Sequence, residues 1–118
     1  KNMKIKNLFL ILLSFLIIIG SSIPGSNIPS NYFFNSDKLL HILEYFIFGY
    51  FLIRCLCNKS IYPFYLTFFL GVTFALADEI YQSTVFGRFS SVNDVIADTI
   101  GLILSIIFYK KISKIINT

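Results

Sequence analysis

The sequence has few charged residues, few cysteines and a single histidine, and each shortage narrows what the chain can be. Only 14% of its 118 residues are charged, whereas soluble domains have roughly 25%. Hydrophobic residues make up 56% of the chain, with 14 Phe and 7 Tyr among the residues. The polar side chains are therefore too few to cover a globule in water, and the length predicts a single domain over residues 1–118.

The shortage of cysteine and histidine also argues against a metal or cofactor site. Cys55 and Cys57 form a C-x-C pair without a second pair or a nearby histidine, which is a weak metal motif. A metal held by His41 with Asp78, Glu79 or Asp98 is conceivable, but one histidine with carboxylates is a weak ligand set for zinc. We therefore expect no metal and no cofactor.

Four continuous apolar blocks dominate the sequence. They predict helices at about residues 5–23, 38–57, 61–80 and 92–110. Each block approaches the roughly 20 residues that a helix needs to cross a bilayer, and continuous blocks do not fit the alternating pattern of a strand barrel. We predict an all-α fold, a four-transmembrane-helix bundle with short loops. A cleaved signal peptide is the alternative for the first block, which lacks a clear A-x-A site, and Met3 is an alternative start of the chain.

The distribution of basic residues predicts the orientation. The formal net charge is +4, but the bases lie at the ends of apolar blocks rather than in one patch, so we expect no nucleic-acid partner. Basic residues favour the cytoplasmic side of a membrane protein. With the amino terminus inside, the cytoplasmic bases are Lys1, Lys4, Lys6, Arg54, Lys59, Lys110, Lys111 and Lys114, and the outer bases are Lys38 and Arg88. We therefore predict a cytoplasmic-membrane protein with both termini in the cytoplasm.

This topology gathers most of the other polar groups at the outer face, in two segments near residues 37–44 and 78–98. The candidate ligand-binding residues there are Asp37, Lys38, His41, Glu44, Asp78, Glu79, Gln82, Arg88, Asp94 and Asp98. A carboxylate inside a membrane helix costs roughly 2.5–3.5 kcal/mol on insertion scales. We expect these groups to be neutral, paired with one another or with Lys38 and Arg88, or facing a wet cavity.

Helical spacing arranges the polar groups into two stripes. One stripe runs down the second helix through Asp37, His41, Glu44, Tyr45 and Phe48. The other runs down the fourth helix through Asp94, Asp98, Gly101 and Ser105. Gly101 and Ser105 have the spacing of small residues that let two helices approach closely.

Simpler roles are available for several of these residues. Ser91 and Asp94 have the S-x-x-D form of a capping box and predict a helix that starts near Val92. Asp37 is a candidate cap of the second helix. Such roles explain each residue singly, but not why the second, third and fourth predicted helices all place charges at one face.

At these residues the sequence resembles the VanZ-like family. Residues 37–49 match the opening pattern D-K-x-x-H-x-x-x-Y-x-x-x-G of that family. Residues 78–101 resemble its second half, D-E-x-x-Q, then G-R, then D-x-x-x-[ND]-x-x-G. Phe86 departs from the Pro that often precedes Gly-Arg, and the first helix carries no motif.

The resemblance implies a bacterial membrane protein that is an accessory of glycopeptide resistance. Teicoplanin differs from smaller glycopeptides by a fatty acyl tail, so an outer-leaflet site for a lipid tail and a polar head is one expectation. Its partners would be the bilayer and either the antibiotic or a lipid-linked cell-wall precursor.

Two other interpretations stay open at this stage. In the first, the chain is an enzyme on a lipid-linked or phosphate-bearing substrate, with His41 and Glu79 as catalytic candidates and Arg88 as an anion clamp. In the second, the charges form a structural ion-pair network without a ligand. The oligomeric state is not predicted.

Overall fold

The computed structural model describes residues 2–22, 34–57, 60–86 and 91–117; at residues 2–4, 6, 34–37 and 115–117 it describes the backbone alone. These residues form helices and contain no strand. The helices are α1 (Asn2–Ser21), α2 (Phe34–Leu56), α3 (Pro63–Gln82) and α4 (Val92–Asn117). The prediction of an all-α fold with four helices is confirmed.

Three of the four helices are long and apolar enough to cross a membrane. Their candidate spans are Lys38–Leu56, Pro63–Gln82 and Val92–Lys114, and α1 contributes a shorter apolar stretch, Asn7–Ser21. Large apolar side chains such as Leu16 and Phe69 are exposed. Lipid tails are the solvent that such exposed side chains require. The chain is therefore a membrane protein, while the side that each end faces stays a prediction.

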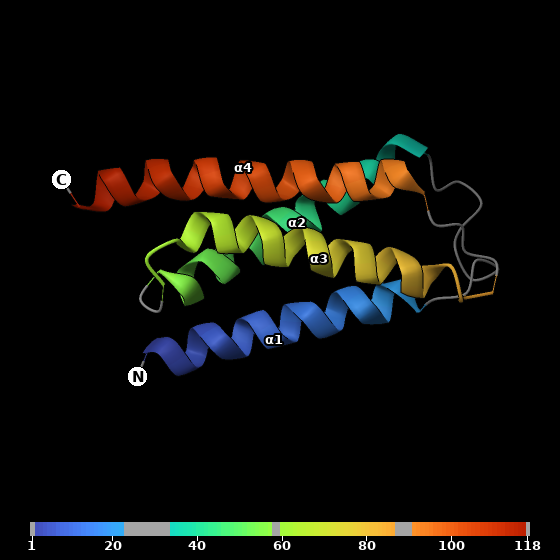
Figure 1. Ribbon diagram of the computed structural model, residues 1–118, viewed down its shortest axis with the longest axis horizontal. Coiled ribbons are helices and arrows are strands. Elements are labelled where there is room, and N and C mark those ends of the chain that lie inside the picture. Colours follow the sequence, from blue (N-terminus) through green and yellow to red (C-terminus); the bar gives the residue numbers. More distant parts are fainter. Residues whose placement is uncertain (1, 23–33, 58–59, 87–90, 118) are drawn as a thin grey trace.

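The helices run alternately up and down, so each end of the bundle collects parts that are distant in sequence. Figure 1 shows both chain termini at one end, together with the last turn of α2 and the first turn of α3. The opposite end brings together the last turns of α1 and α3 and the first turns of α2 and α4. We call this opposite end the polar end, because the buried polar residues described below gather there.

The core lies where α2 faces the other helices. Tyr45, Phe48 and Leu52 of α2 form one buried cluster with Leu102 of α4 and with residues of α1 and α3. The step from Tyr45 to Phe48 to Leu52 is three and then four residues, which keeps all three on one face of α2. Of the helix pairs, α2 and α4 are the most extensively packed.

Glycines allow this close packing of α2 and α4. A Cβ at Gly101 would lie 3.0 Å from the backbone N of Phe46 and closer still to the carbonyl oxygen of Ile42. A Cβ at Gly49 would lie 3.1 Å from the Cβ of Ser105. The predicted role of Gly101 and Ser105 in helix packing is confirmed.

Some helix bounds differ from those expected. Helix α2 begins at Phe34, so Asp37 lies within its first turn and the prediction that Asp37 caps this helix is wrong. Helix α4 continues to Asn117 rather than ending near residue 110, because its basic last turns contain neither Gly nor Pro to end a helix. Helix α3 starts with Pro63, a residue whose fixed φ and missing N–H suit the first helical position.

Candidate functional site

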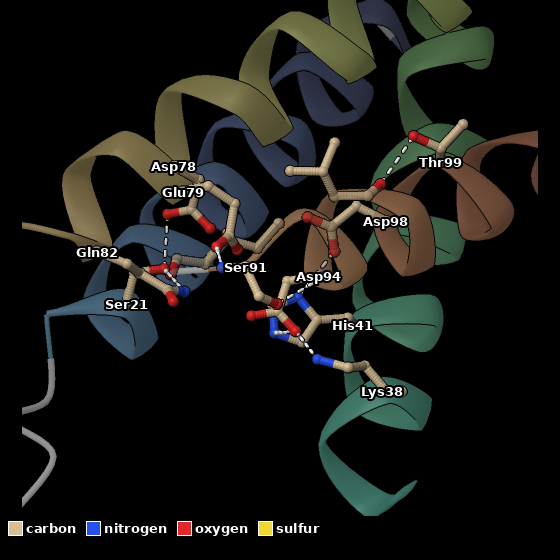
Figure 2. A network of polar contacts seen from close by, with 12 residues as sticks. Ser21, Lys38, His41, Asp78, Glu79, Gln82, Ser91, Asp94, Asp98 and Thr99 are labelled. Carbon is tan, nitrogen blue, oxygen red and sulfur yellow. Dashed lines mark hydrogen bonds and ion pairs between the residues drawn. The ribbon is translucent and has the colours of Figure 1, made fainter. Parts of the chain in front are cut away.

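Buried polar residues from all four helices meet at the polar end (Figure 2). A membrane helix can hold such groups only where partners replace water, so their contacts decide what the site can do. The residues that we call the polar cluster are Ser21 of α1, Lys38 and His41 of α2, Asp78, Glu79 and Gln82 of α3, Ser91, which precedes α4, and Asp94 and Asp98 of α4.

Two polar side-chain pairs join α2 to α4. The Nδ1 atom of His41 lies 2.8 Å from Oδ1 of Asp98, whose side chain is fully buried. One turn closer to the amino-terminal ends of α2 and α4, Lys38 pairs with Asp94. The Nε2 atom of His41 faces Oδ1 of Asp94 at 3.8 Å. Steps of three residues on α2 and four on α4 bring both pairs into register, and the expected pairing of these carboxylates with Lys38 and His41 is confirmed.

A second set of hydrogen bonds joins α1 to α3. The hydroxyl of Ser21 donates to Oδ1 of Asp78 at 2.6 Å and accepts a hydrogen bond from Nε2 of Gln82 at 3.1 Å. All three side chains are buried. Next to them, the hydroxyls of Ser22 and Tyr81 lie 2.7 Å apart. The end of α1 is thus held to α3 by polar contacts.

Glu79 lies between these two sets, and its contacts modify the predicted capping box. The Ser91 hydroxyl accepts from the backbone N–H of Asp94 at 3.2 Å, which confirms that α4 starts at Val92. In a capping box the Asp94 carboxylate would in turn accept from the Ser91 N–H. Instead the Ser91 N–H donates to Oε2 of Glu79 at 3.2 Å, because Asp94 is engaged with Lys38.

The described part of the polar cluster is rich in acid. It contains four buried carboxylates, those of Asp78, Glu79, Asp94 and Asp98, and two basic side chains, Lys38 and His41. The sequence motif also includes Arg88, which lies outside the described residues.

A pocket lies against this cluster at the α3–α4 interface. Its volume is about 270 Å³. Its apolar walls are Leu76, Ile80, Val92 and Val95, and its polar lining is Glu79, Ser83 and Ser91. Since Leu76, Ile80 and Val92 are also exposed on the helix surfaces, the pocket connects the lipid-facing side of the bundle with Glu79.

The structure brings together most, but not all, of the candidate ligand-binding residues that the sequence predicted. Lys38, His41, Asp78, Glu79, Gln82, Asp94 and Asp98 are brought together. Glu44 is exposed, whereas His41 and Tyr45 of the same predicted stripe are buried. The side chain of Asp37 and the whole of Arg88 lie outside the described part of the chain.

Sequence reasoning missed Ser21. It lies near the end of the first predicted helix, next to a Ser-, Asn- and Pro-rich segment, and it was not among the candidate residues. The available signal was topological: the last turn of the first helix must end beside the last turn of the third in an up-and-down bundle.

Replacing Ser21 by alanine is expected to destabilise the protein by about 1–3 kcal/mol, because Asp78 and Gln82 would lose a buried partner. Ser14→Ala is the matched control, since the Ser14 hydroxyl donates to the Leu10 carbonyl of its own helix. Thermal unfolding in detergent micelles measures both. Equal melting temperatures for the two variants would contradict the role of Ser21.

Among known proteins, one family matches almost the whole chain. A family model described as VanZ/LLP1 matches residues 2–116. The match includes α1, which carries no part of the sequence motif. No curated protein and no solved structure matches the chain.

Proposed function

The chain belongs to the VanZ/LLP1 family, and from this premise we propose that it binds an amphiphile of the cell envelope, with the head group at the polar cluster and the acyl chain along α3 and α4. The observation that carries the proposal is the pocket of about 270 Å³ between these helices, which joins apolar walls to the Glu79 carboxylate. A lipid tail and a polar head need such adjoining surfaces.

The charge of the polar cluster limits which chemical groups the head group of the ligand can carry. An enzyme for phosphate-bearing substrates needs bases at its binding site, but in the described cluster Lys38 is paired with Asp94 and His41 with Asp98. The Glu79 carboxylate, which lines the pocket, favours a head group with an ammonium or with several N–H and O–H donors. An acylated glycopeptide such as teicoplanin, which the family resemblance suggests, is the first ligand to test. The site then faces the outside of a bacterial cytoplasmic membrane, as the distribution of Lys and Arg predicts.

Filling the pocket should block binding. Val95→Phe puts a larger side chain into the pocket wall and is expected to weaken teicoplanin binding about tenfold or more, the effect of roughly 1.4 kcal/mol. Ile103→Phe is the control, because Ile103 is exposed on the same helix and does not line the pocket. Isothermal titration of the purified protein in micelles measures both affinities.

The acyl tail supplies a second comparison. A glycopeptide without the tail should bind more weakly than teicoplanin to the unmodified protein. Equal binding of the two antibiotics, or equal effects of Val95→Phe and Ile103→Phe, would refute the proposal.

A further inference from the structure

Three side chains from three helices converge within the polar cluster. His41 of α2, Glu79 of α3 and Asp98 of α4 are all buried. Each offers one nitrogen or oxygen ligand atom, and these atoms lie within 4.8 Å of one another. The sequence argued against a metal because it has a single histidine, but the fold places two carboxylates from other helices beside that histidine.

The bonding of the two carboxylates is incomplete. Oε1 of Glu79 and Oδ2 of Asp98 have no hydrogen-bond partner among the described residues. The Glu79 residue is 5% exposed and Asp98 is 0% exposed. Buried polar atoms are nearly always hydrogen-bonded, and an exception requires an explanation such as a missing ion. A cation bound between these carboxylates and the imidazole would give both oxygens a partner.

We propose that His41, Glu79 and Asp98 bind a divalent transition-metal ion such as Zn²⁺. Imidazole nitrogen with carboxylate oxygens suits Zn²⁺, Mn²⁺ or Fe²⁺, whereas Mg²⁺ and Ca²⁺ prefer oxygen alone. Three protein ligands also leave a fourth position of a tetrahedral ion open. Binding of the ion would give a partner to Oε1 of Glu79 and Oδ2 of Asp98 and offset part of the negative charge.

The geometry needs only a small closure. Ligands of a tetrahedral Zn²⁺ at about 2.0–2.1 Å lie roughly 3.3 Å apart, so the present separations of up to 4.8 Å must shorten. Nδ1 of His41 and Oδ1 of Asp98 are 2.8 Å apart and share a hydrogen bond. A metal ion bound to Nδ1 would leave one proton on the imidazole, at Nε2, and any further proton would leave to the solvent.

The surroundings supply the two other features that a metal site needs. Nε2 of His41 faces Oδ1 of Asp94 at 3.8 Å, and a carboxylate beyond the metal-binding histidine commonly orients its ring. The pocket between α3 and α4 leads to Glu79 and gives the ion a path of entry. The proposal does not depend on amphiphile binding.

Titration of metal-stripped, purified full-length protein with Zn²⁺ alone tests the site. The expected result is saturable binding of about one ion per chain, with a rise in melting temperature. Glu79→Gln should weaken binding at least tenfold, while its remaining oxygen still accepts from the Ser91 N–H. Glu44→Gln is the control, because Glu44 is an exposed carboxylate on the helix of His41 and should leave the affinity unchanged.

Two further measurements decide between site-specific and loose binding. Replacing Zn²⁺ by Co²⁺ should give the visible absorption of a nitrogen- and oxygen-coordinated ion, and an excess of Mg²⁺ should not displace it. No saturable Zn²⁺ binding to the folded protein, or equal losses in Glu79→Gln and Glu44→Gln, would overturn the proposal. Teicoplanin is absent throughout, so failure here leaves the proposed function standing, and the reverse also holds.

Discussion

Replacing Lys38 by methionine should destabilise the bundle by about 3–5 kcal/mol, because it leaves the buried carboxylate of Asp94 without its ammonium partner. Methionine keeps most of the apolar stem of lysine, so the change isolates the charge. The Asp94 side chain is 7% exposed and has little access to water. Chemical unfolding in detergent micelles measures the free energy.

Replacing the acidic partner, Asp94, is expected to destabilise the protein less than replacing Lys38. Asp94→Asn leaves the lysine, whose side chain is 19% exposed and whose long stem lets the ammonium move toward the head groups. The double variant, Lys38→Met with Asp94→Asn, should recover much of the stability lost in Lys38→Met alone. This non-additivity gives the coupling energy of the pair.

Lys111→Met is the matched control for the loss of a lysine. Lys111 is exposed near the far end of α4, where a surface charge contributes within about 0.5 kcal/mol. If Lys38→Met and Lys111→Met unfold alike, or if the double variant is merely the sum of the single ones, the Lys38–Asp94 pair is not a stabilising contact.

The polar end could be predicted from the sequence because it follows from the length of the apolar blocks and from the helical spacing of the polar residues. Apolar block length predicted the helices, and alternate topology placed the acidic segments together at one end. The steps from Asp94 to Asp98, Gly101 and Ser105 predicted a single face of α4, and all four residues are buried. Each of these inferences needs only the geometry of one helix and the order of the helices.

Other features depend on distances between helices, which the sequence does not contain. Glu44 was placed on the stripe of His41 because it follows His41 by three positions, which is close to one helical turn. At 100° per residue it falls at the edge of the face shared by His41, Tyr45 and Phe48, and the packing leaves it exposed. Similarly, several carboxylates were equivalent partners for His41, and only the packing of α2 on α4 selects Asp98.

That packing depends on Gly101, and Gly101→Ala is expected to destabilise the protein by about 1–3 kcal/mol. The new Cβ would meet the backbone of Ile42 and Phe46, which no change of rotamer can move away. Gly71→Ala should cost less, because its Cβ would meet only the flexible side chain of Leu102, at 2.6 Å. Thermal unfolding in micelles measures all variants.

Gly20→Ala is the matched control, and it should stabilise the protein where Gly101→Ala destabilises it. A Cβ at Gly20 meets nothing within 4 Å, so alanine there adds only its better helix propensity, up to about 1 kcal/mol. A stabilised Gly101→Ala would mean that α2 and α4 are not in backbone contact.

The same substitution tests whether helix packing controls the site. Gly101 lies one turn from Asp98, and its neighbour across the interface, Ile42, follows His41 in α2. Pushing the two helices apart at this point would lengthen the His41–Asp98 contact, now 2.8 Å, and with it the proposed metal site. Gly101→Ala should therefore weaken Zn²⁺ binding at temperatures where it is still folded, whereas Gly71→Ala should not. Equal Zn²⁺ affinity in the two folded variants would show that the site tolerates movement of α2 relative to α4.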